Sequence, residues 1–438
     1  MKKLITYLLL PAFAWLSACD KDDDAEKPVT PSIIAIYPSS GHPNMIITIK
    51  GKNFSTVRED NKVQLGGKAA VVIEASEYAL QVVSPEDGTT GPVTVATPKG
   101  TVTGGLFTYL PPLEEYQVST LAGSGTAGSV DGPVADALFR TVQGVAIGAD
   151  GSVIVTDRGN NRIRRITTAG QAVPIAGATT AGYVNATGAA ARFRLPWRAV
   201  EDAQGNIFVA DRDNHAIRKI TPAGVVSTVA GTGVAGFADG DANTAQFNQP
   251  LDIVVDAAGN LYVADNLNHR IRKIATDGQV TTIAGNGTAA FANGTGTAAQ
   301  FRNPSGLEID KDGNLLIADR LNQRIRKVTP AGVVTTLAGD GNSGYLDGDA
   351  AGARFADPYG ITIDADGNVY VADLNNHKIR KISPEGKVVS IAGGARGFTD
   401  GLGAGAQLNT PTDVCVDAQG NVYVADQANH AIRKLTKK

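Results

Sequence analysis

The chain has 438 residues, a formal net charge of -3 and 51 glycines. This length suffices for two or three domains, the near-neutral charge argues against a nucleic-acid-binding surface, and two cysteines are too few for a disulfide framework. Because no helical period of apolar residues stands out, we predict an all-β protein.

Residues 1–18 have the pattern of a secretory signal peptide, with two lysines, a short apolar run and then small residues. The run is too short for a membrane-spanning helix. Residues 16–19, Leu-Ser-Ala-Cys, resemble a bacterial lipobox, which implies that Cys19 is lipidated and becomes the first mature residue. The alternative is a signal that is cleaved elsewhere, next to an incidental cysteine.

Residues 19–31 are predicted to form a lipidated acidic tether, since four of the five residues 20–24 are aspartates. An acidic run after a lipidated cysteine resembles the export signal of Bacteroidetes surface lipoproteins. The resemblance implies an outer-membrane protein, lipid-anchored and facing the cell exterior. A calcium loop is the alternative interpretation of these carboxylates, but the glycine that turns such a loop is absent.

Residues 32–110 are predicted to form a separate β-domain, because short apolar runs alternate with Gly, Pro and Asn turns. The expected strands are 46–50, 63–65, 70–73, 80–83, 93–96 and 106–109. The pattern Ile47-x-Ile49-x-Gly51-x-Asn53-Phe54 and the closing Phe107-x-Tyr109 resemble an IPT/TIG immunoglobulin-like sandwich. The resemblance implies a domain that spaces or packs, here lifting the rest of the chain off the membrane.

Residues 115–438 contain an internal repeat whose most regular member is an aspartate. It stands at Asp157, Asp211, Asp265, Asp319, Asp373 and Asp426, with a spacing of 54 residues that becomes 53 at the last step. Each unit has four short apolar runs separated by turn residues. A period near 54 with four antiparallel strands per unit predicts a β-propeller, here of six blades.

The ends of the repeat array predict how the ring closes. After Asp426 the chain supplies only a third strand, at residues 431–435, whereas residues 117–122 match the fourth strand of the other units. We therefore expect 117–122 to pair with 431–435, which removes an exposed sheet edge.

The repeat resembles the NHL repeat, whose pattern Pro-x-Gly-Ile-x-x-Asp-x-x-Gly-Asn-x-Tyr-Val-Ala-Asp-x-x-Asn-His-x-Ile-Arg-Lys-Ile is found nearly whole at residues 358–382. This resemblance is specific for the fold but not for the function, because propellers include both binding modules and enzymes.

Residues that recur in every blade are interpreted as structural. Each unit has an Arg seven residues after the repeated Asp, which we expect to pair with it. An Asn three residues after the Asp is expected to tie its turn to its own backbone. A buried Phe or Leu in the inter-blade loop is expected to fill the core.

Histidine occupies one repeat position in four blades, at His215, His269, His377 and His430. One such residue per blade, away from the axis, does not bring ligands to a common point, so we predict neither a metal site nor a cofactor. Asp310 and Asp364 begin sequences that look like parts of a calcium loop, but they are expected to form hairpin turns.

Residues that differ from those at the equivalent position in other blades are concentrated where each inter-blade loop leads into the innermost strand. That position surrounds the mouth of the central channel in a propeller, and the variable turns after the repeated Asp lie on the same face. The predicted ligand-binding residues are Gln143, Trp197, Arg198, Asp252, Ser305, Tyr359, Asp413, Arg212 and Arg320.

An aromatic ring beside planar polar side chains suits a sugar, whose apolar faces stack while its hydroxyls form hydrogen bonds. The leading hypothesis is therefore a non-catalytic surface lipoprotein that binds a glycan, with no nucleic-acid partner. One alternative is a propeller hydrolase or lyase that uses Asp252 and Asp413, with Arg198. Another is a protein-interaction platform in an outer-membrane uptake complex.

Overall fold

The computed structural model describes residues 30–109 and 115–438. The predicted signal peptide, Cys19 and nearly all of the tether lie outside these residues. The chain divides into two compact units, Met1–Leu113 and Glu114–Lys438, which are described separately. Within the described residues, no helix has both the length and the apolar character needed to cross a membrane.

The first unit is built from eight strands that alternate buried and exposed residues, as in β3, where Ile47 and Ile49 are fully buried. The strand order is β1-β3-β6-β5-β4-β7-β8-β2. The six predicted strands are β3 to β8, and β1 and β2 are additional. The bounds are β1 Ser32–Tyr37, β2 Ser40–Gly41, β3 Ile46–Lys52, β4 Lys62–Leu65, β5 Lys68–Ala75, β6 Ala79–Val83, β7 Gly91–Thr97 and β8 Gly100–Tyr109, with a 3-10 turn η1 at Arg58–Asp60.

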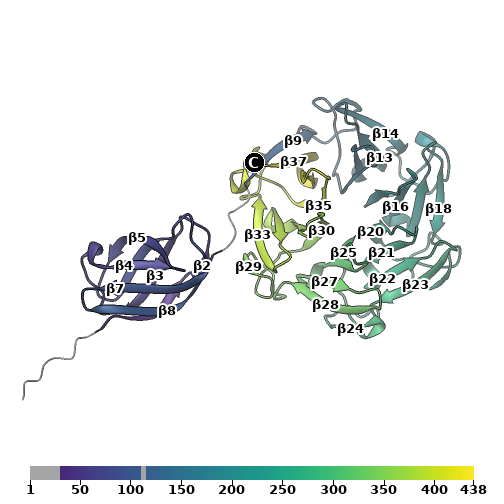
Figure 1. Ribbon diagram of the computed structural model, residues 1–438. Coiled ribbons are helices and arrows are strands. Elements are labelled where there is room, and N and C mark those ends of the chain that lie inside the picture. The colour runs from purple at the N-terminus through teal and green to yellow at the C-terminus, as the bar shows by residue number, and fades with distance from the viewer. Residues whose placement is uncertain (1–29, 110–114) are drawn as a thin grey trace, which may run out of the picture. The chain divides into compact units, whose positions relative to one another are not determined.

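The second unit is a ring of six sheets, as predicted (Figure 1). From the channel outward, blade 1 contains β11 Gly144–Ile147, β12 Val153–Asp157, β13 Arg162–Ile166 and β14 Gln171–Gly177. Blade 2 contains β15 Ala199–Glu201, β16 Ile207–Asp211, β17 Ala216–Ile220 and β18 Val226–Ala230. Blade 3 contains β20 Pro250–Val255, β21 Leu261–Asp265, β22 Arg270–Ile274 and β23 Gln279–Ala284.

Blade 4 contains β25 Pro304–Ile309, β26 Leu315–Asp319, β27 Arg324–Val328 and β28 Val333–Ala338. Blade 5 contains β30 Pro358–Ile363, β31 Val369–Asp373, β32 Lys378–Ile382 and β33 Lys387–Ala392. Blade 6 contains β35 Pro411–Val416, β36 Val422–Asp426, β37 Ala431–Lys437 and, from the start of the unit, β9 Tyr116–Ala122.

The predicted closure of the ring is confirmed. Strand β9 pairs antiparallel with β37, placing Thr120 opposite Arg433 and Val118 opposite Leu435. Figure 1 shows β9 beside β37, close to the C-terminus. Both ends of the unit thus share one sheet, and β37 is not left as an unpaired edge.

The prediction of four strands per blade was incomplete, because all blades except blade 2 have a fifth strand of two residues. These are β10 Gly132–Pro133, β19 Gly240–Asp241, β24 Gly294–Thr295, β29 Gly348–Asp349 and β34 Gly401–Leu402. They are formed by the inter-blade loops, so in these five blades the outer strand is paired with the chain's own backbone. Three 3-10 turns, η3 Gly188–Ala190, η6 Gly296–Ala298 and η9 Gly403–Gly405, lie in the same loops.

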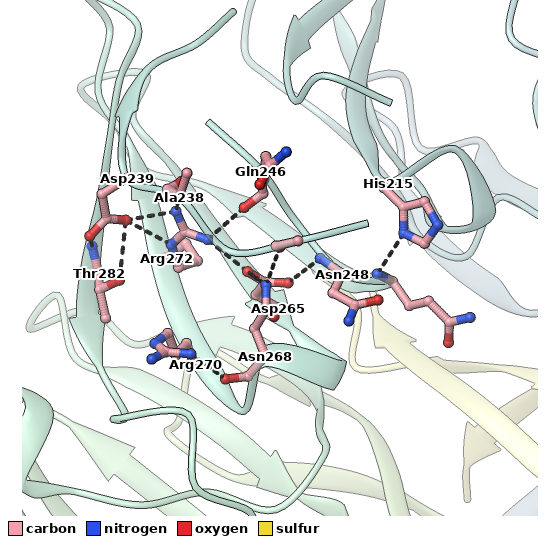
Figure 2. A network of polar contacts seen from close by, with 12 residues as sticks. His215, Ala238, Asp239, Gln246, Asn248, Asp265, Asn268, Arg270, Arg272 and Thr282 are labelled. Carbon is pink, nitrogen blue, oxygen red and sulfur yellow. Dashed lines mark hydrogen bonds and ion pairs between the residues drawn. The ribbon is translucent and has the colours of Figure 1, made fainter. Parts of the chain in front are cut away.

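A buried polar network fixes each inter-blade loop, and Figure 2 shows it for blade 3. Nη1 of Arg272 lies 2.7 Å from Asp265 Oδ2 and donates to the carbonyl of Gln246, while Nη2 binds Asp239 in the loop. Asn268 donates to Asp265 at 2.8 Å and to the carbonyl of Gly236 at 2.7 Å. The predicted pairing of Arg with Asp is confirmed, whereas the Asn side chain binds the carboxylate and a loop carbonyl instead of the backbone of its own turn.

The loops are anchored in the core by the recurring aromatic residues. Phe139, Phe193, Phe247, Phe301 and Phe355 are fully buried, as is Leu408 in the sixth blade. The guanidinium group of the repeated Arg lies against these rings, for example 5.1 Å from the ring centroid of Phe247 for Arg272. The same arginine therefore joins the polar network to the apolar core between blades.

Candidate functional site

A tight turn precedes the innermost strand of every blade and directs the chain into it. In each of these turns one residue has a left-handed backbone, with φ between 46° and 56°: Thr141, Leu195, Gln249, Asn303, Asp357 and Thr410. The innermost strand begins at the next residue in blades 3 to 6 and a few residues later in blades 1 and 2. The side chains that follow this turn therefore meet at one end of the channel.

The left-handed turn is held by the preceding blade. Nδ1 of His215 accepts a hydrogen bond from the backbone N–H of Gln249 at 3.1 Å, and His430 binds Thr141 in the same way at 3.0 Å. In blade 1 the acceptor is Asn161 Oδ1, which binds the N–H of Leu195 at 2.8 Å. The repeat position thus requires an acceptor, which explains why Asn and Gln replace His in two blades.

Burial lowers the pKa of His215 and of the other three histidines at this position. Each ring accepts a hydrogen bond from a turn of the next blade. No group of three or more His, Cys, Asp or Glu side chains in residues 30–109 and 115–438 is arranged to hold a metal ion. Asp310 and Asp364 bind the backbone N–H groups of their own hairpin turns, as expected.

The structure brings the predicted site residues together. Gln143, Trp197, Arg198, Asp252, Ser305, Tyr359 and Asp413 line one cavity, together with Leu251, Gly360 and Thr412. Its volume is about 10 Å³, roughly the space of one water molecule. No sugar ring fits there, so a ligand on this face would bind above these residues.

Two aromatic rings meet across the channel at this level. Trp197 comes from blade 2 and Tyr359 from blade 5, and their ring centroids lie 5.9 Å apart with an interplanar angle of 30°. Such offset stacking is favourable for aromatic pairs. Because the two blades are on opposite sides of the ring, the pair spans the channel.

Three arginines lie over these rings. The guanidinium carbons of Arg158 and Arg212 are 4.7 Å and 4.6 Å from the ring centroid of Trp197, and that of Arg320 is 5.2 Å from Tyr359. All three begin the 3-10 turn after a repeated Asp, in η2 Arg158–Asn160, η4 Arg212–Asn214 and η7 Arg320–Asn322. The other blades have η5 Asn266–Asn268, η8 Leu374–Asn376 and η10 Gln427–Asn429 at this place.

Arg198, Asp252 and Asp413 form a buried ion triad beside the rings, each at most 4% exposed. Nη1 of Arg198 contacts Asp413 Oδ2, and its Nε lies 3.5 Å from Asp252 Oδ1. The carboxylates also accept backbone N–H groups of neighbouring blades, from Val145 for Asp413 and Leu307 for Asp252, both at 2.8 Å. These three charges are therefore used to join blades.

The remaining two predicted residues are likewise engaged. Oγ of Ser305 lies 3.1 Å from the carbonyl oxygen of Tyr359, and Gln143 Oε1 accepts a hydrogen bond from Gln427 at 2.7 Å. Both are about 1% exposed. They hold the channel mouth in shape.

Two functional candidates were missing from the predicted set. Arg158 has the same place in its turn as Arg212 and Arg320, so the pattern of the repeat would have identified it. Glu308 lies three residues after Ser305 in the innermost strand β25, and burial raises its pKa to about 7. It accepts a hydrogen bond from Thr362 at 3.3 Å. The residues at the equivalent position in the other blades are uncharged, and this difference in the sequence could have identified Glu308.

Comparisons with protein families agree with both units. Residues 31–109 match the IPT/TIG domain, residues 118–293 the teneurin NHL domain, residues 237–410 the SMP-30/gluconolactonase/LRE-like region and residues 408–435 the NHL repeat. The chain thus combines an IPT/TIG domain with NHL repeats that form a six-bladed propeller.

The chain is 34% identical over 265 residues to the protein SUPPRESSOR OF QUENCHING 1, chloroplastic, of Arabidopsis thaliana, covering 56% of this chain and 25% of that protein. It is 30% identical over 323 residues to NHL repeat-containing protein 2 of Homo sapiens, covering 65% of this chain and 44% of that protein. The chain therefore spans less than half the length of these curated relatives.

Among solved structures, an auxiliary nutrient binding protein from Bacteroides thetaiotaomicron has a TM-score of 0.57, with 16% identity, 93% of this chain covered and 98% of that chain covered. At this identity the likeness establishes the fold alone.

Proposed function

We propose that the protein is a non-catalytic, lipid-anchored surface protein that binds a glycan on the propeller face formed by Trp197, Tyr359 and the arginines above them. The observation that carries this proposal is the layer of guanidinium groups on an aromatic pair, over a channel mouth too small to admit a ligand. Planar N–H donors suit sugar hydroxyls, and the partly exposed ring of Trp197 suits apolar C–H groups, whereas Tyr359 is 5% exposed and packs beneath the face.

The ion triad favours binding over hydrolysis at this face. Asp252 and Asp413 face Arg198 and backbone donors, in a cavity of about 10 Å³, so neither carboxylate has room for a water and a glycosidic bond together. The match to the SMP-30/gluconolactonase/LRE-like region keeps a hydrolase as the alternative, which glycan-cleavage assays on the same preparations would detect.

The cell-surface part of the proposal rests on the lipobox-like residues 16–19 and the acidic run after Cys19. The name of the Bacteroides structural neighbour, a nutrient binding protein, agrees with ligand capture. Replacing Cys19 with Ser should release the protein from the membrane fraction, and protease treatment of intact cells should degrade the wild-type protein. Co-purification from solubilised membranes tests for an outer-membrane uptake complex.

Affinity electrophoresis through gels containing single polysaccharides tests the binding site. Retardation of the wild-type protein should disappear in Trp197→Ala. A matched control is Tyr78→Ala, which removes a 62% exposed aromatic ring from the other unit and should leave retardation unchanged. Equal retardation of Trp197→Ala and wild type would exclude this face as the site.

A further inference from the structure

Arginine is distributed unevenly over the propeller face that carries the channel mouth. Each blade contributes two positions to this face, which we call the corner of that blade. They are the residue after the buried Phe or Leu and the residue after the repeated Asp. Both are Arg in blade 1 (Arg140 and Arg158), in blade 2 (Arg194 and Arg212) and in blade 4 (Arg302 and Arg320), and neither is Arg in the other blades.

The two arginines of a corner are neighbours in space. The backbone N–H of Gly159, next to Arg158, donates to the carbonyl of Arg140 at 2.9 Å. Leu321, next to Arg320, donates to Arg302 at 3.1 Å in the same way. The two linked positions are therefore either both Arg or both uncharged, which indicates a property of the face and not of a single residue.

Few acidic groups oppose these six arginines. Arg212 lies 3.3 Å from Asp213, and Arg320 lies 3.1 Å from Asp357. In the described part of the chain, the side chains of Arg140, Arg158, Arg194 and Arg302 have no ion-pair partner within 4.0 Å. These corners are thus basic although the whole chain has a net charge of -3.

Arg158 is the most distinctive of them. It is only partly exposed, packs on Trp197, and has no ion-pair partner within 4.0 Å among the described residues. Burial and the neighbouring Arg212 lower its pKa, and Tyr359 and Asp213 offset this only in part. Holding a partly desolvated cation beside another cation is unfavourable, and a bound anion would relieve that cost.

We propose that the ligand of this face is an acidic glycan, whose carboxylate or sulfate group is bound by Arg158 and Arg212, with Arg320 on the other side of the aromatic pair. This inference rests on the proposed glycan-binding function. Planar guanidinium groups bind such oxyanions through paired N–H donors, while the sugar ring lies against the partly exposed ring of Trp197.

The test is binding of the purified full chain to polysaccharides that differ only in charge. Polygalacturonate is compared with its methyl ester, and chondroitin sulfate with desulfated, carboxyl-reduced chondroitin, by titration calorimetry. The acidic member of each pair should bind at least about tenfold more tightly, since hydrogen bonds to charged groups are the stronger ones. Raising the salt concentration should weaken this binding.

Arg158→Gln and Arg212→Gln should each lower affinity for the acidic polysaccharide about tenfold or more, whereas Arg58→Gln, an exposed arginine in the other unit, should not. Thermal unfolding of each variant should match wild type, and Arg158→Lys should restore part of the affinity. If the variants that lose affinity also have a lower unfolding temperature, the loss would contradict a direct role of these arginines in binding.

The outcomes separate the two proposals. Equal binding of acidic and neutral polysaccharides, lost in Trp197→Ala, would overturn the acidic ligand and leave glycan binding intact. Binding to neither would overturn both. Tighter binding to single-stranded RNA than to any polysaccharide would overturn the acidic glycan in favour of a nucleic acid.

Discussion

The rings of Trp197 and Tyr359 lie 5.9 Å apart although they come from blades on opposite sides of the propeller. Since each ring also lies under a guanidinium group, the pair is both a cross-brace of the channel and the floor of the proposed binding face. Substitutions here should therefore affect stability and binding in different proportions.

The Trp197–Tyr359 contact should be measurable as a coupling free energy. We expect Trp197→Leu and Tyr359→Leu to destabilise less in combination than the sum of the single changes predicts, by about 0.5–1.5 kcal/mol. Urea unfolding of the two single variants and the double variant gives this value. Strict additivity would mean that the rings are neighbours without mutual stabilisation.

The buried ion triad should be strongly coupled. Arg198→Met leaves Asp252 and Asp413 buried without their cation, and we expect a loss of about 3–5 kcal/mol in the free energy of unfolding. Adding Asp252→Asn and Asp413→Asn to that variant should recover part of the loss. If Arg198→Met alone were neutral in chemical denaturation, the triad would not be holding the blades.

The repeat position that is His in four blades needs a hydrogen-bond acceptor, and this acceptor does not have to be an imidazole. His430→Asn should retain near wild-type stability, because Asn161 already occupies the equivalent place with a left-handed backbone. His430→Leu leaves the N–H of Thr141 without its acceptor and should cost about 1–3 kcal/mol. Denaturant midpoints of the two variants distinguish them, and similar losses in both would contradict this explanation.

These histidines should also make stability depend on pH. Burial lowers their folded-state pKa, so below the ordinary value of about 6.5 the unfolded chain binds more protons than the folded chain. Their contribution is therefore complete above pH 6.5 and is lost as the pH falls below it.

A variant with Asn at all four histidine positions should lose less stability between pH 7 and pH 5 than the wild-type protein. Burial raises the pKa of Asp265 to about 6, which acts in the opposite direction over this range, but that group is present in both proteins and cancels in the comparison. Parallel stability curves for the two proteins would refute the assignment to histidine.

The sequence alone determined the propeller. Six copies of one unit fix the number of blades, and the missing fourth strand after Asp426 fixes the closure with residues 117–122, because an unpaired strand edge is unfavourable. The repeat also separated structural residues such as Arg272 and Asp265 from the variable ones at the mouth, since whatever every blade needs must recur in every blade.

Only the tertiary structure decided what the variable residues do. Whether Trp197 reaches Tyr359, and whether Arg198 lies between Asp252 and Asp413, depends on the width of the channel and on side-chain reach across it, which no repeat pattern encodes. Packing therefore placed the charges of Arg198, Asp252 and Asp413 against one another inside the ring. It placed Arg212 and Arg320 over the aromatic pair on its face.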